Sequence, residues 1–94
     1  MAAYIIAQID LTDVDAYQGY AATTPAIAEQ FGGKFLAKGG PAQQLEGEGR
    51  SRNVIIEFPD VDAATRFYNS AEYQAVLPIA LANSEREMVL VEGV

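Results

Sequence analysis

The sequence contains no cysteine and no histidine among its 94 residues. Without cysteine the chain has no disulfide, no zinc–thiolate site, no iron–sulfur cluster and no thiol nucleophile. Without histidine it lacks imidazole metal ligands, a Ser-His-Asp triad and histidine acid–base chemistry. No group of carboxylates has the spacing of a calcium loop, so we expect no metal site and no cofactor.

Positive charge is also scarce, since 6 lysines and arginines face 13 aspartates and glutamates and give a net charge of −7. That charge argues against a nucleic-acid partner, whose phosphates would repel the chain. No apolar run approaches the roughly 18 residues of a membrane span. The N-terminus lacks a basic region and a cleavage site, so we expect no secretory signal and a cytoplasmic protein with no membrane partner.

Half of the residues are hydrophobic and 20% are charged, which is typical of a folded domain. The length fits one domain over residues 1–94. β-Branched and apolar segments predict strands at 4–9, 34–38, 53–58 and 87–91. Apolar residues recur at helical spacing from Thr12 or Asp13 to Phe31, and again after Asp60 and after Ser70. This pattern predicts helices in these segments.

Two prolines interrupt the helical segments. Pro25 predicts a kink or a short break, and Pro78 predicts a kink. The order strand, helix, strand, strand, helix, strand is that of the ferredoxin-like fold. We therefore predict an α+β domain with a four-stranded antiparallel sheet and helices on one face.

Alternation along the strands separates the two faces of this sheet. One face is entirely apolar and should lie under the helices: Ile5, Ala7, Ile9, Phe35, Ala37, Val54, Ile56, Phe58, Met88 and Leu90. The opposite face covers roughly 300 Å² and half of its side chains are large and apolar. An exposed patch of that size usually marks an interface, so we predict a homodimer through the sheet face that the helices leave open.

The open face also carries polar residues, whose grouping depends on register. If Leu36 pairs with Ile55, one end of the face gathers Gln8, Lys34, Glu57 and Glu87, and the other end gathers Tyr4, Lys38 and Asn53. Enclosed between two sheets, Glu57 would be a candidate catalytic acid or base, with Gln8 a candidate ligand-binding residue. The alternative is a solvated rim with a surface pair between Lys34 and Glu57.

A second candidate site follows the strand at 34–38. Lys38, Gly39 and Gly40, together with Arg50 and Arg52, could bind a small carboxylate through backbone amides and cationic side chains. The alternative is a simple turn. The loop from Gly39 to Arg52 is either a functional segment or an arm toward a partner subunit, with an extra strand conceivable at 43–46.

Asn69 and Tyr73 could line the mouth of a pocket. The alternative is that Asn69 ends one helix and Ser70 caps the next.

Several motifs run through the whole chain in order: Phe31-Gly32-Gly33-Lys34-Phe35-Leu36, Lys38-Gly39-Gly40-Pro41, Leu45-Glu46-Gly47, Ile56-Glu57-Phe58-Pro59, Phe67-Tyr68-Asn69-Ser70, Glu72-Tyr73-Gln74 and Val91-Glu92-Gly93-Val94. With the Tyr17 and Tyr20 helix, they resemble domain-of-unknown-function family 1330. The resemblance implies a dimeric α+β barrel, in which two ferredoxin-like sheets pack face to face.

The wider superfamily includes cofactor-independent monooxygenases, muconolactone isomerase-like enzymes and haem-dependent chlorite dismutases. None of their catalytic motifs occurs in this sequence, and the missing histidine argues against a histidine-ligated haem. Lys38 stands where the family is expected to carry arginine often, which keeps the charge but loses the bidentate fork.

Two functions remain open. The first is a homodimer that binds, and without a cofactor transforms, a small organic molecule between the sheet and the helices or between the sheets. The second is a non-catalytic dimeric module that binds a metabolite or a protein. A closed polar cavity containing Glu57 would favour the first, and a barrel filled by side chains would favour the second.

Overall fold

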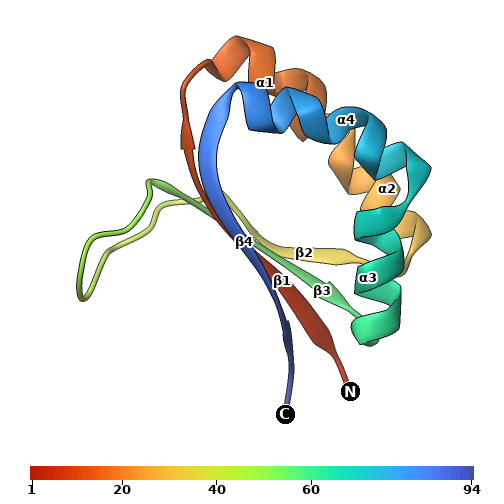
Figure 1. Ribbon diagram of the computed structural model, residues 1–94. Coiled ribbons are helices and arrows are strands. Elements are labelled where there is room, and N and C mark those ends of the chain that lie inside the picture. Colours follow the sequence, from red (N-terminus) through yellow and green to blue (C-terminus); the bar gives the residue numbers. More distant parts are fainter.

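The computed structural model describes the whole chain, residues 1–94. Its elements are β1 (Ala3–Leu11), α1 (Val14–Ala21), α2 (Thr24–Gln30), β2 (Lys34–Lys38), β3 (Arg52–Phe58), α3 (Val61–Asn69), α4 (Ala71–Ala82) and β4 (Ser84–Glu92). The sheet has the order β2-β3-β1-β4, and every neighbouring pair is antiparallel. All four helices cover one face and leave the other open (Figure 1). The predicted ferredoxin-like fold is confirmed.

Local sequence signals set the helix boundaries. The carboxylates of Asp13 and Asp60 accept the amides of Ala16 and Ala63, and Ser70 caps α4 in the same way. The first predicted helical segment is broken near Pro25. α1 ends at Ala21, and α2 begins at Thr24 with Pro25 in its first turn. α4 continues through Pro78 as one helix. No helix combines the length and the hydropathy that a membrane crossing requires.

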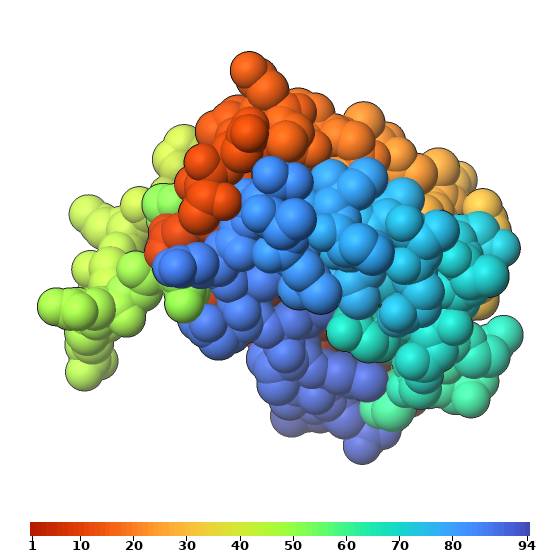
Figure 2. Space-filling view, turned by 45° about the horizontal axis from the view of Figure 1, so that its top comes forward, coloured from red at the N-terminus to blue at the C-terminus, as the bar shows by residue number.

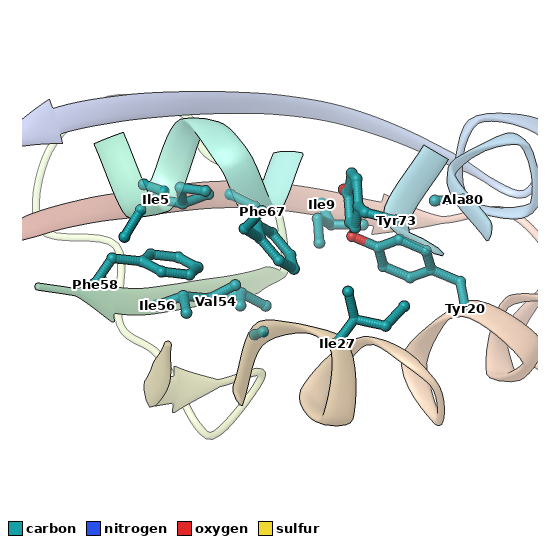
Figure 3. Close-up of a cluster of buried hydrophobic side chains, with 14 of the residues drawn as sticks. Ile5, Ile9, Tyr20, Ile27, Val54, Ile56, Phe58, Phe67, Tyr73 and Ala80 are labelled. Atoms are coloured by element: carbon teal, nitrogen blue, oxygen red, sulfur yellow. The ribbon is translucent and has the colours of Figure 1, made fainter. Parts of the chain in front are cut away.

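The core lies between the helices and the sheet (Figure 3). Its centre is Phe67 of α3, which is fully buried. The Phe67 ring lies 5.2 Å from Phe58 of β3 and 4.7 Å from Tyr73 of α4, measured between ring centroids. These contacts join β3, α3 and α4, three elements that follow one another along the chain.

A β-bulge in β2 changes which side chains face the core. Lys34 and Phe35 pair with Glu57 and Ile56, but after the bulge it is Ala37 that opposes Ile55. The extra residue reverses the alternation of everything that follows it in the strand. The expected pairing of Leu36 with Ile55 is therefore wrong. Ala37 shares the open face with Ile55, and Lys38 turns to the helix-covered face beside Val54.

The register also corrects the polar map of the open face. Tyr4 lies opposite Glu57, whereas Gln8 lies opposite both Asn53 and Glu87. Since β1 runs antiparallel to both neighbours, Gln8 and Glu57 belong to opposite ends of the face. The predicted group of Gln8, Lys34, Glu57 and Glu87 is therefore split: Lys34 and Glu57 lie with Tyr4, and Gln8 and Glu87 lie with Asn53.

The helix-covered face is not wholly apolar. β3 and β4 begin earlier than predicted, and both Arg52 and Arg86 lie opposite Ile9 of β1. They share the face of Ile9 because cross-strand partners point the same way. Together with Lys38, they give one end of the core face three cationic side chains.

Residues 39–51 form an arm without regular structure, and it stands away from the body of the molecule (Figures 1 and 2). The extra strand considered at 43–46 is absent. Leu45 is the arm's one large apolar side chain, and 85% of its surface is exposed.

Candidate functional site

A cavity lies between α1 and the sheet, at the end where β2 and β3 meet the arm. Its volume is about 30 Å³, which is room for roughly two water molecules. Most of its wall is apolar or aromatic, and the lining residues are Ile5, Ala7, Ile9, Tyr17, Tyr20, Ala21, Thr24, Phe35, Lys38, Arg52, Val54, Ile56 and Met88. No carboxylate lines it.

Two cations line this cavity without a carboxylate partner. Arg50 and Arg66 are the only cationic side chains that form ion pairs, so Lys38 and Arg52 form none. The Nε of Arg52 is buried and has no hydrogen-bond partner. A buried guanidinium N–H without an acceptor is costly. The Nε–H of Arg52 is therefore a donor for which the chain provides no acceptor.

Gly39 makes room for Arg52. Its φ of +71° is in the left-handed region, and its amide donates to the carbonyl of Asn53 at 2.9 Å. A β-carbon on Gly39 would overlap the guanidinium of Arg52, whereas a β-carbon on Gly40 would meet nothing. Of the two predicted glycines, Gly39 thus supports the position of Arg52, and Gly40 makes no such contact.

Arg86 holds three tyrosine hydroxyls beside the cavity. Its guanidinium donates to the hydroxyls of Tyr17, Tyr20 and Tyr73 over 3.2–3.3 Å. The hydroxyls of Tyr20 and Tyr73 are also 2.8 Å apart and point toward each other (Figure 3). Burial raises the pKa of Tyr17 and of Tyr73 above the usual value of 10.0, against the opposing effect of Arg86. Both phenols are therefore neutral at physiological pH.

Sequence reasoning missed Arg86 because it lies outside the strand predicted at 87–91. The alternation that places Met88 on the core face also places Arg86 there. Extending the predicted strand to Arg86 would therefore have identified it as a core-facing cation.

Arg50 lies elsewhere, although the sequence suggested that it might join Lys38 and Arg52. It forms a two-pronged pair with Glu87, with N–O distances of 2.8 and 2.9 Å, and a further bond of 3.0 Å to Asp10. Asp10 also accepts the backbone amide of Ser51 at 3.0 Å. These contacts attach the base of the arm to β1 and β4 on the open face.

This attachment should depend on pH. The Ser51 amide lowers the pKa of Asp10 below its usual 3.8, and the Arg50 hydrogen bond lowers that of Glu87 below 4.5. A lowered folded-state pKa means that the stabilisation is complete above the usual value and is lost as the pH falls through the lowered one. We expect the Ser51 amide signal in NMR to titrate with a midpoint below 3.8, and this titration to vanish in Asp10→Asn. A midpoint at or above 3.8 would contradict the assignment.

The remaining predicted residues do not converge on the cavity. Glu57 accepts a hydrogen bond from Tyr4 on the open face, and Gln8 donates to Asn53 at the far end of that face. Tyr73 is fully buried in the core. Asn69 is the last residue of α3 and lines a separate groove beside β4.

Comparison with known proteins gives a family and a fold. A family model described as domain of unknown function (DUF1330) matches residues 2–94. No protein of curated function matches the chain. A protein of unknown function from Rhodopseudomonas palustris has a TM-score of 0.82 at 18% identity, over 99% of this chain and 82% of that one.

Two further solved structures share the fold. A dimeric ferredoxin-like protein of unknown function from Jannaschia sp. CCS1 has a TM-score of 0.79 at 16% identity, over 99% of this chain and 100% of that one. SnoaB, a cofactor-independent oxygenase from Streptomyces nogalater, has a TM-score of 0.66 at 14% identity, over 99% of this chain and 93% of that one.

Proposed function

Because the chain belongs to the DUF1330 family, whose description assigns no activity, we propose a function from its own cavity: it binds a small organic carboxylate between the sheet and the helices, as a homodimer packed through the open sheet face.

The unpartnered Nε of Arg52 carries this proposal. In a chain with a net charge of −7, a cavity lined by Lys38 and Arg52 but by no carboxylate is an exception to the overall charge. A guanidinium binds a carboxylate through two parallel hydrogen bonds, and such charge-assisted bonds are stronger than neutral ones. A carboxylate ligand would therefore satisfy the buried donor.

The lining favours binding over catalysis. Glu57, the predicted acid or base, lies on the other face of the sheet, and the cavity contains no carboxylate. Burial raises the pKa of Tyr17 at its edge, so that this phenol stays neutral. SnoaB is a cofactor-independent oxygenase of the same fold, but fold alone transfers no activity. The small, largely apolar cavity fits a non-catalytic module better.

The open face supports the dimer. Ile6, Ile55 and Val89 lie side by side across its middle, and Val89 is 55% exposed. Covering such a face against a second copy removes this apolar surface from water. The Jannaschia protein of the same fold is described as dimeric.

Titration with butyrate, followed by NMR of the arginine Nε–H signals, tests the binding. We expect the Arg52 signal to move on addition of butyrate, and Arg52→Gln to weaken binding roughly 10- to 100-fold, which corresponds to about 1.5–3 kcal/mol for hydrogen bonds to a charged group. Arg66→Gln is the matched control, because it removes the same positive charge from an exposed ion pair with Asp62 on α3. Equal effects of the two variants would sink the proposal.

A pair of glycine variants tests the geometry in the same assay. Gly39 and Gly47 have nearly equal φ values of +71° and +69°, but only a β-carbon at Gly39 would meet Arg52. Gly39→Ala should therefore weaken butyrate binding, whereas Gly47→Ala, with the same backbone strain and open space around it, should leave it unchanged.

A further inference from the structure

A groove lies on the helix-covered side, at the opposite end from the cations. It runs between α3 and β4 and has a volume of about 250 Å³, and Figure 2 shows the hollow between α3 and the C-terminal end of β4. Its wall is mostly apolar, and two of its large side chains, Tyr68 and Leu90, are 39% and 38% exposed. Leu90 points to the helix side of the sheet yet remains open to solvent. The groove thus leaves apolar surface without a covering partner.

Two side chains separate this groove from the cavity at Arg52. Ile5 and Met88 line both hollows. Ile5 is 3% exposed in a central strand, and its branched side chain is stiff. Met88 lies in the edge strand β4, is only partly buried and has an unbranched, flexible side chain. Its sulfur is 3.9 Å from the Arg86 guanidinium, so it reaches from the groove to the cationic end.

We propose that Met88 is a movable partition, and that the protein selects carboxylates with an apolar tail: the carboxylate binds at Arg52, and the tail displaces the Met88 side chain and extends into the groove. This rests on the proposed function and deepens it, because it names the ligand class. The cavity of about 30 Å³ is too small for a long apolar tail. The groove supplies an apolar wall and the extra volume that a tail needs.

The chain offers a direct reporter, since its two methionines are Met1 and Met88. Met1 is 71% exposed and serves as an internal reference. In protein carrying ¹³C-methyl methionine, we expect acetate to move the Arg52 Nε–H signal without moving the Met88 methyl signal. Hexanoate and octanoate should move both. Affinity should rise about fourfold for each buried methylene until the groove is filled.

Met88→Ile is the discriminating variant, because it replaces the flexible side chain by a stiff one of similar size. The gain in affinity with tail length, measured relative to acetate in the same variant, should disappear. Hexan-1-ol, which has the tail without the carboxylate, should move neither reporter at the concentrations that suffice for hexanoate.

Two failures are distinguishable. If the acids of every length bind equally at Arg52 and the Met88 methyl signal stays still, the carboxylate site stands and the partition is wrong. If no acid moves the Arg52 signal, the proposed function falls and the partition falls with it.

Discussion

Replacing Val89 by aspartate is expected to make the protein monomeric at micromolar concentrations at which the unchanged chain is a dimer. Val89 lies opposite Ile6 in the middle of the open face. Sheet-to-sheet packing would bury the new carboxylate without a partner, which costs roughly 3–5 kcal/mol for each charge, and each dimer would contain two. Each factor of ten in a dissociation constant corresponds to roughly 1.4 kcal/mol, so the dissociation constant of the dimer should rise at least a thousandfold. Native mass spectrometry or light scattering measures the change.

Val14→Asp is the matched control. Val14 is 57% exposed, close to the 55% of Val89, but it is the first residue of α1 on the helical side. A carboxylate there is favoured by the helix N-terminus, so the variant should stay dimeric. If both variants remain dimers, the subunits meet through another surface; if the unchanged chain is a monomer, the dimer itself is refuted.

Phe67→Ala should lower the free energy of unfolding by about 3–5 kcal/mol, the usual cost of emptying a buried phenylalanine site. The cost should be at the upper end, because Phe67 packs between the rings of Phe58 and Tyr73, and rigid rings cannot close the space. Urea denaturation measures it, with the protein concentration held constant because unfolding of a dimer depends on concentration.

The neighbouring residue provides the comparison. Tyr68 is 39% exposed, so Tyr68→Ala removes an aromatic ring without leaving an enclosed cavity and should cost less than about 1 kcal/mol. Similar losses in Phe67→Ala and Tyr68→Ala would mean that the core is not centred on Phe67. Because Tyr73 also binds Tyr20 and Arg86, the loss of Phe67 should weaken butyrate binding as well.

The features that local sequence determines could be predicted. Asp13, Asp60 and Ser70 cap helices because their short side chains accept hydrogen bonds from free backbone amides three residues ahead. The apolar alternation of β1 and β3 identified the core face, and the element order then limited the topology to very few arrangements.

The site itself was harder to predict. Nothing in Lys34–Lys38 marks the bulge, since the strand contains no glycine or proline, and the bulge depends on pairing with β3. Arg52 and Arg86 lie outside the strands predicted at 53–58 and 87–91, because the strand ends depend on pairing with β1. The sequence suggested Arg50 as a partner of Lys38 because both are cationic, whereas Arg50 binds Glu87, which is 37 residues away. Each error concerns contacts between distant segments.

The bulge in β2 has an evolutionary consequence. A deletion of one codon at Leu36 would restore simple alternation and keep the lysine at position 38 opposite Val54, on the helix-covered side of the sheet. A chain of unchanged length that lacked the bulge would instead pair Leu36 with Ile55 and place this lysine on the open face. The bulge alone therefore decides which side of the sheet receives the charge. Homologues that are one residue shorter in this strand should consequently be aligned with the gap at position 36, which keeps the lysine in register with Val54.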